Sequence, residues 1–384
     1  MRIPGVTSTG SKRPEALFGT DVDVPLRFAR ASGCTVWDET GRPYVDMIMG
    51  LGAVALGYGY PAVIGAAAKA LEAGVTGPLP PLLEDEVAER LCAAIPGAES
   101  VRFLKTGAEA VAAAVRIARV QTGRDRVVTC GYHGWLDWCQ GEAGVPHAVR
   151  EFRTEIAFGD VSQLESALGA GADVAAIVVE PVIDGPPPLQ WLEVLRARAT
   201  AIGAVLVFDE IKTAFRIARG GAAERWGILP DLLVVGKALG NGFPIAAVTG
   251  GRDLMNAACE TWISSTLATE SVSLAAAKAV LETYDLEPVI AHLESAGQRF
   301  FDGLRVCAER HPHVVAAVRG MPQMCYLESR TAELSAALAR AAARQGLLLK
   351  RTAYNYVSLA HGEETLTSVF DRLDRAMEEI ASTC

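Results

Sequence analysis

Several features that would place this chain in a membrane-bound, secreted or metal-binding class are missing from its 384 residues. No hydrophobic run approaches the roughly 20 residues of a transmembrane helix, and residues 1–5 lack the apolar stretch of a signal peptide. The eight cysteines form no CxxC pair, which favours reduced thiols and predicts no metal site. A net charge of −9 argues against a nucleic-acid partner. Together these absences predict a cytoplasmic protein that binds neither membrane nor nucleic acid.

What the chain does have is the composition of a folded globular protein, with 50% hydrophobic and 21% charged residues. From about residue 100 to 250, short apolar runs alternate with helical patterns. Near-continuous apolar strands separated by helices are typical of a parallel sheet covered on both faces. An α/β domain with a mainly parallel sheet sandwiched by helices is therefore predicted. Its strands are expected at Val127–Cys130, Ala175–Glu180, Val205–Asp209, Leu232–Gly236 and Ala246–Thr249.

The flanking segments predict a second, smaller domain of α+β type. A long alanine-rich helix begins at about residue 271, and residues 289–384 then read as helix, strand, strand, helix, strand, strand, helix. Near the N-terminus, residues 38–42 form a turn between two expected strands. We expect residues 1–50 to contribute to the small domain, 51–285 to form the large domain and 286–384 to form the rest of the small one.

A carboxylate and an amine end two of the predicted strands. Ligands of parallel sheets bind beyond the carboxyl ends of the strands, so Asp209, Lys237 and also Glu180 are expected to share one site. Lysine in apolar surroundings has a lowered pKa and is nucleophilic. This pair suits pyridoxal 5′-phosphate (PLP), which needs a lysine for its Schiff base and an acid at its pyridine nitrogen. The alternatives are a solvated lysine and a carboxylate that caps a turn.

Two further segments fit such a site. The helix expected after Thr106 would offer free backbone N–H groups for a phosphate, with Gly107 permitting close approach; an ordinary capping box with Glu109 is the alternative. Tyr132 follows the strand at Val127–Cys130 and could stack on a cofactor ring, or belong to the core. His133 could support that stacking or be a hydrogen-bonded core histidine.

Taken in order, the motifs resemble the fold-type I, class III PLP-dependent aminotransferases, and within them the glutamate-1-semialdehyde 2,1-aminomutase branch. The resemblance spans about residues 35 to 365. Each motif is only moderately specific, but the occurrence of all of them in the order found in the family is highly specific. The segments that carry it are Thr106–Ala110, Tyr132–Gly134, Val179–Val182, Phe208–Ile211, Phe215-Arg216, Pro230–Leu232, Gly236–Gly240, Gly250–Arg252 and Val357–His361.

The resemblance implies roles for single residues and a fold-type I architecture, in which the mainly parallel sheet of the large domain has seven strands. Lys237 would form the Schiff base and carry a proton, and Asp209 would bind the pyridine nitrogen. Tyr132 and Ile211 would cover the two faces of the ring. The phosphate would be held at Thr106, Gly107 and Ala108, and by Thr266 of a neighbouring subunit, so a homodimer with shared active sites is implied. Glu180 would lie near the cofactor.

The chain departs from the aminomutase branch on the substrate side. Trp135-Leu136-Asp137 stands where that branch typically has His-Ala-Asp, and the segment leading to Thr266 is shorter than the gating loop of that branch. A missing lid favours exchange of products and hence ordinary transamination. Arg13 is a candidate for binding a substrate carboxylate, with a solvated arginine as the alternative. Trp135 and His133 are further candidates for substrate contact.

The first hypothesis is therefore an aminotransferase that passes an amino group from a small-molecule donor to a ketone or aldehyde by a ping-pong mechanism. The second is a glutamate-1-semialdehyde 2,1-aminomutase that serves tetrapyrrole synthesis. The third, a non-catalytic relative, predicts no Schiff base at Lys237. Fold alone does not fix which reaction such a protein runs.

Overall fold

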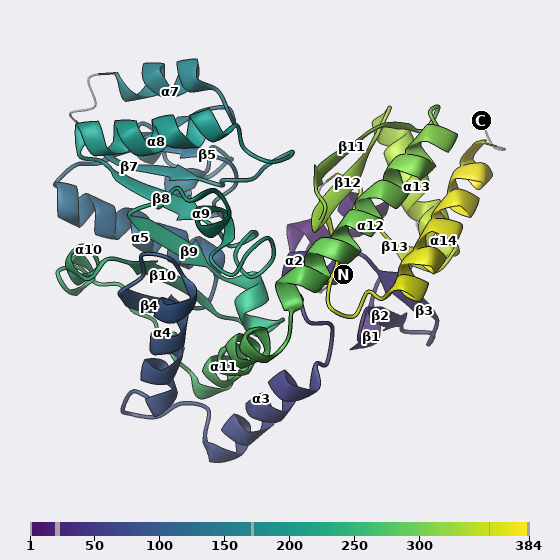
Figure 1. The fold of residues 1–384 in the computed structure, drawn as a ribbon, viewed down its shortest axis with the longest axis horizontal. Coiled ribbons are helices and arrows are strands. Elements are labelled where there is room, and N and C mark those ends of the chain that lie inside the picture. The colour runs from purple at the N-terminus through teal and green to yellow at the C-terminus, as the bar shows by residue number, and fades with distance from the viewer. Residues whose placement is uncertain (1, 20–23, 170–172, 353, 382–384) are drawn as a thin grey trace. The chain divides into compact units, whose positions relative to one another are not determined.

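The computed structural model describes residues 2–19, 24–169, 173–352 and 354–381. The chain divides into two compact units (Figure 1). The large unit is Pro61–Ile290, and the small unit combines Met1–Tyr60 with Ala291–Cys384. The boundaries expected from the sequence lie at residues 50 and 285, and that division into domains stays a prediction.

The large unit is built on a sheet that has seven strands in the described residues, in the order β4-β10-β9-β8-β7-β5-β6. From β9 to β6 every neighbouring pair is parallel, whereas β10 runs antiparallel to both β9 and β4. The expected mainly parallel sheet is thus confirmed. The strands are β4 (Ser100–Leu104), β5 (Arg126–Cys130), β6 (Arg153–Glu155), β7 (Val174–Val179), β8 (Val205–Asp209), β9 (Leu232–Val235) and β10 (Ala246–Gly250).

The two edge strands, β4 and β6, were not predicted from the sequence. Each is half-buried over most of its length, whereas β7, β8 and β9 are buried at every residue. A strand at the edge of a sheet has fewer neighbours, so it carries no continuous apolar run that would reveal it.

Helices cover the sheet on both faces. In Figure 1, α8 lies on one side of β7 and β8, and α5 on the other. Val205 and Val207 pack in one core cluster with residues of α5, so the alternate side chains of β8, such as Phe208, point to the opposite face. The helical segments are α3 (Pro61–Ala73), α4 (Leu82–Ala94), α5 (Gly107–Thr122), η2 (Asp137–Cys139), α6 (His147–Arg150), α7 (Val161–Leu168), α8 (Leu189–Ile202), α9 (Gly221–Trp226), η3 (Lys237–Gly240), α10 (Arg252–Met255), η4 (Asn256–Cys259) and α11 (Ser271–Leu286).

The small unit contains two sheets, with strand orders β1-β2-β3-β13 and β11-β12-β14. From residue 289 onward the element order matches the prediction. Its elements are η1 (Gly10–Lys12), α1 (Pro14–Phe18), β1 (Phe28–Ser32), β2 (Thr35–Asp38), β3 (Pro43–Asp46), α2 (Met49–Gly52), α12 (Val289–Arg310, which begins in the large unit), β11 (Val315–Met321), β12 (Met324–Ser329), α13 (Ala332–Arg344), β13 (Leu347–Leu348), β14 (Asn355–Tyr356) and α14 (Glu363–Ala381).

Within the described ranges, no helix is long and apolar enough to span a membrane. The same residues contain no cluster of histidine, cysteine and acidic side chains that could hold a metal ion. The seven described cysteines are all free thiols.

Candidate active site

Four adjacent strands of the large sheet deliver the residues of the candidate site. The strands are neighbours in the order β9-β8-β7-β5. Asp209 is the last residue of β8, whereas Lys237 follows β9, Glu180 follows β7, and Tyr132 and His133 follow β5. Because the four strands are parallel, their carboxyl ends lie along one edge of the sheet. These predicted site residues therefore lie along one edge of the sheet.

Asp209 forms a buried pair with His133. The carboxylate oxygen Oδ2 lies 2.9 Å from Nδ1 of the imidazole, and the two side chains are 4% and 1% exposed. The other oxygen, Oδ1, accepts only a long bond of 3.3 Å from the backbone N–H of Ile211. His133 is therefore a hydrogen-bonded, buried histidine, which was one of the two alternatives expected from the sequence. It orients the Asp209 carboxylate and leaves Oδ1 able to accept a hydrogen bond from a further donor.

The neighbouring carboxylate, Glu210, points elsewhere. It is fully buried and accepts hydrogen bonds from the backbone N–H groups of Ala222 and Ala223, each at 2.8 Å, at the start of α9. Burial raises its pKa to about 7. Glu210 therefore holds α9 against the end of β8, and Asp209 alone faces the candidate site.

Lys237 sits directly after β9 in a strained backbone conformation. Its φ is +45°, in the left-handed region that residues with a side chain rarely adopt. Burial lowers the pKa of its amine to about 8, and the positive charge of Lys212 acts in the same direction, while Glu180 and Asp209 oppose it. A larger fraction of the amine is therefore uncharged near neutral pH than in an ordinary lysine, and uncharged amine is the form that attacks a carbonyl group.

Glu180 makes two contacts at the end of β7. Its Oε1 lies 3.1 Å from Nζ of Lys212, and its Oε2 accepts a 3.1 Å hydrogen bond from the backbone N–H of Tyr132. Lys212 is 6% exposed. Lys212 could not be recognised from the sequence, because a lysine three residues after a strand-ending aspartate carries no signal of its own.

The start of α5 combines the two expected alternatives, a capping box and a set of free backbone N–H groups that could bind a phosphate. Thr106 and Glu109 form a capping box, with the Thr106 Oγ1 accepting from Glu109 N–H at 3.3 Å and the Glu109 carboxylate accepting from Thr106 N–H at 2.9 Å. This box leaves the N–H groups of Gly107 and Ala108 without a partner in the described residues. The helix start is therefore both capped and open to an anion.

Two glycine contacts bring α5 against the other segments. A Cβ atom on Gly107 would lie 2.5 Å from Cδ1 of Ile211, and one on Gly134 would lie 2.5 Å from Cβ of Ala108. Gly134 also has a φ of +105°, which favours glycine. The segments after β5 and β8 thus both pack on the first turn of α5.

These observations fit PLP. The residues that would hold it are Asp209 at the ring nitrogen, Gly107 and Ala108 at the phosphate and Ile211 against one face of the ring. The unpartnered N–H pair of α5, the free capacity of Asp209 Oδ1 and the low pKa of Lys237 are what such a molecule requires.

The remaining predicted residues are more exposed. Tyr132 is 66% and Trp135 75% exposed, and Thr266 is also on the surface of the large unit. Arg13 is exposed in the small unit, between η1 and α1. Their roles in stacking on PLP, in contacting substrate and in reaching a partner subunit stay predictions.

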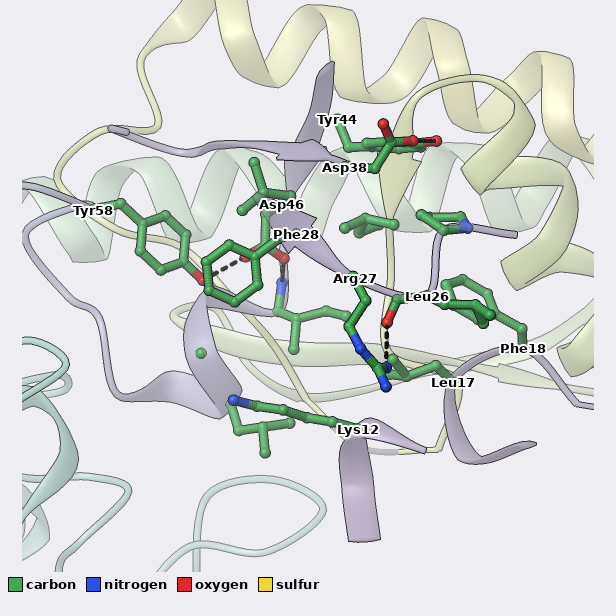
Figure 2. Close-up of a pocket in the computed structure, with 16 residues that line it drawn as sticks. Lys12, Leu17, Phe18, Leu26, Arg27, Phe28, Asp38, Tyr44, Asp46 and Tyr58 are labelled. Atoms are coloured by element: carbon green, nitrogen blue, oxygen red, sulfur yellow. Dashed lines mark hydrogen bonds between the residues drawn. The ribbon is translucent and has the colours of Figure 1, made fainter. Parts of the chain in front are cut away.

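A separate pocket of about 180 Å³ lies within the small unit (Figure 2). Its walls are mostly apolar and include Leu17, Phe18 and Phe28, which Figure 2 labels. The buried Asp46 in its wall is already bonded, accepting from the Tyr58 hydroxyl and the Ile48 N–H at 2.7 Å each. The described residues that line it include no histidine.

A family model and two curated relatives match the chain. The model of the family "Aminotransferase class-III" matches residues 19–383. A protein from Rhodopirellula baltica named glutamate-1-semialdehyde 2,1-aminomutase is 35% identical over 327 residues, which are 79% of this chain and 74% of the relative. One of the same name from Thermomicrobium roseum is 32% identical over 409 residues, covering 97% of this chain and 95% of the relative.

Among solved structures, the fold is similar to that of the PLP internal aldimine form of the FumI protein from Sphingopyxis sp. MTA144. The TM-score is 0.92 at 26% sequence identity, and the match covers 97% of this chain and 92% of the other. The similarity thus extends over both units of the chain.

Proposed function

This chain belongs to the class-III aminotransferase family and is a PLP-dependent enzyme, and we propose that it transfers an amino group from a small-molecule amino donor to a ketone or aldehyde. One observation carries the proposal: a half-buried lysine whose pKa is lowered to about 8 shares a sheet edge with the buried Asp209–His133 pair. The transfer would follow a ping-pong mechanism, with the donor product leaving before the acceptor enters.

The side chains divide the work of such a reaction. PLP, when bound, supplies an electron sink for the electron pair left on the substrate carbon. Asp209, oriented by His133, would keep the ring nitrogen protonated through Oδ1, which accepts only the long bond from Ile211 N–H. The Lys237 amine would act as base when it removes the proton from the substrate carbon that bears the amino group, and its ammonium form would then act as acid when it gives this proton back from the same face. The N–H groups of Gly107 and Ala108 bind and orient the phosphate.

A spectral titration tests the proposal. Purified PLP-loaded protein is mixed with glutamate, glutamine, alanine, amino sugars or 4,5-diaminovalerate, and the visible band of the bound cofactor is followed. We expect one of the amino acids or amino sugars to bleach that band and to release the matching carbonyl compound. Protein that shows no visible band with PLP, or that responds to none of the compounds, would contradict the proposal.

The matched control is Lys237→Ala. We expect this variant to bind PLP without a covalent bond, so that borohydride treatment attaches the cofactor to the wild-type peptide containing Lys237 and to no peptide of the variant. Turnover in the variant at the wild-type rate would exclude Lys237 as the proton carrier.

A second candidate is glutamate-1-semialdehyde 2,1-aminomutase, which the names of the two curated relatives favour. An aminomutase moves the amine along a single molecule and must keep its intermediate enclosed. In the titration it would respond to 4,5-diaminovalerate alone, and it would isomerise glutamate semialdehyde rapidly with no amino donor added.

A further inference from the structure

Lys212 is a second buried lysine beside the candidate site, and the proposed mechanism gives it no task. It follows the Asp209–Ile211 segment directly, and its side chain is 7% exposed. Its ammonium group lies 3.1 Å from Oε1 of Glu180, whose side chain is 14% exposed. A buried ion pair carries a desolvation cost that a hydrophobic pair of the same size would not. Its presence at this edge of the sheet therefore points to a use in the site.

The ion pair is connected to Tyr132 through the other oxygen of Glu180. Oε2 accepts the Tyr132 N–H at 3.1 Å. The same oxygen would lie 2.7 Å from a Cβ atom built on Gly131, whose φ is +100°. The carboxylate is thus closely packed against the Gly131–Tyr132 peptide, and Lys212 holds it there from the opposite oxygen.

The ion pair also lies within electrostatic reach of Lys237. The charged groups that act on the Lys237 amine are Lys212, Glu180, Asp209 and Arg216. Lys212 and Arg216 favour the uncharged amine, and the two carboxylates favour the charged one. Lys212 thus offsets Glu180, which would otherwise stabilise the ammonium form of Lys237.

We propose that Lys212 is a positioning residue of the active site: through Glu180 it fixes the backbone that carries Tyr132, and its positive charge opposes the charge of Glu180 at the Lys237 amine. The inference rests on the proposed role of Lys237.

The test measures the reactivity of Lys237 in protein freed of PLP. An amine-reactive reagent is applied between pH 6 and 10, and modification of the Lys237 peptide is followed by mass spectrometry. For Lys212→Met we expect labelling about tenfold slower than in wild type below pH 8, since loss of a neighbouring like charge raises the pKa of an amine. Lys212→Arg retains the charge and should label at nearly the wild-type rate.

Glu180→Gln separates charge from general loosening of the site. Removing the negative charge should make Lys237 label faster, opposite to Lys212→Met, whereas a loosened structure would shift both variants in the same direction. Amide hydrogen exchange at Tyr132 should speed up in both Lys212→Met and Glu180→Gln, because each weakens the contact that protects this N–H. Unchanged labelling in Lys212→Met, or shifts of the same sign in both variants, would overturn the inference.

Lys278→Met is the matched control. Lys278 also pairs with a glutamate, with Nζ 2.7 Å from Oε2 of Glu86, but on the surface of the large unit. Its removal should leave the labelling of Lys237 unchanged. Borohydride trapping of PLP in the wild type distinguishes failure of this inference from failure of the proposed function. If PLP is trapped on Lys237 but Lys212→Met leaves the labelling of Lys237 unchanged, only the inference is rejected. If no PLP is trapped on Lys237, the proposed function itself is rejected.

Discussion

At the residue scale, Lys237 combines a strained backbone with an amine that loses its proton at a lower pH than an ordinary lysine. Below pH 8 the amine is charged in both the folded and the unfolded chain, and burying that charge costs free energy. Between pH 8 and 10.5 the folded chain has released the proton and the unfolded chain still holds it. The unfolded state then binds more protons, so the free energy of unfolding should rise with pH across this window.

Comparison of the PLP-free wild type with Lys237→Met isolates this contribution. Relative to the variant, the wild type should gain roughly 2 kcal/mol in its free energy of unfolding from pH 8 to 10.5. Urea unfolding at a series of pH values measures the difference, and other titrating groups cancel between the two proteins. A difference that stays flat across the window would mean that the pKa of Lys237 is not lowered in the folded chain.

At the element scale, the first turn of α5 is a junction where small residues allow close packing. Gly107 leaves room for the side chain of Ile211, and Gly134 leaves room for Ala108. The turn can therefore meet the segment after β8 while its N–H groups at Gly107 and Ala108 stay open. The helix start and Ile211, which is predicted to face the cofactor ring, are thus placed by one contact.

Gly107→Ala should disturb the cofactor site more than the fold. The new methyl group would lie 2.5 Å from the end of the Ile211 side chain, which can rotate away, and alanine is the better helix former. We expect PLP to bind about tenfold more weakly, for an equivalent loss of about 1.4 kcal/mol, with little change in thermal stability. Gly65→Ala in α3, where nothing lies within 4 Å of the new atom, is the control and should leave PLP affinity unchanged. Equal PLP affinity in both variants would rule out the contact as a determinant of the site.

At the scale of the whole molecule, the resemblance to the class-III aminotransferases predicts a homodimer with shared active sites. Thr266 lies on the surface of the large unit, in the segment between η4 and α11. If it completes the phosphate site of a partner subunit, then each active site draws Lys237 from one chain and Thr266 from the other.

A mixed dimer tests this arrangement. One chain carries Lys237→Ala and the other Thr266→Ala, so with shared sites both lesions fall in one site and the second site is intact. We expect the mixed dimer to recover about half of the wild-type activity, while neither parent variant alone reaches it. No recovery in a dimer verified by mass would place Thr266 in the site of its own chain, and a monomeric wild type in sedimentation would exclude the dimer.

The sequence by itself determined the mainly parallel sheet, because buried strands such as β7 and β8 carry unbroken apolar runs whose pattern is local. It also marked Asp209 and Lys237, since each ends such a run, and it set the order of elements from α12 to α14. The edge strands β4 and β6 escaped prediction because partial exposure erases that pattern.

Only the tertiary structure decided which side chains meet. His133 and Asp209 are 76 positions apart in the chain, and the link from Lys212 through Glu180 to Tyr132 joins the ends of three strands. Such contacts depend on the strand order β9-β8-β7-β5. Crossover connections between strands that are distant in the sequence determine this order, and the local pattern of apolar residues does not predict it. The chemistry that each residue can perform is therefore predictable from the sequence. The partner that orients its side chain or shifts its pKa is determined by the fold.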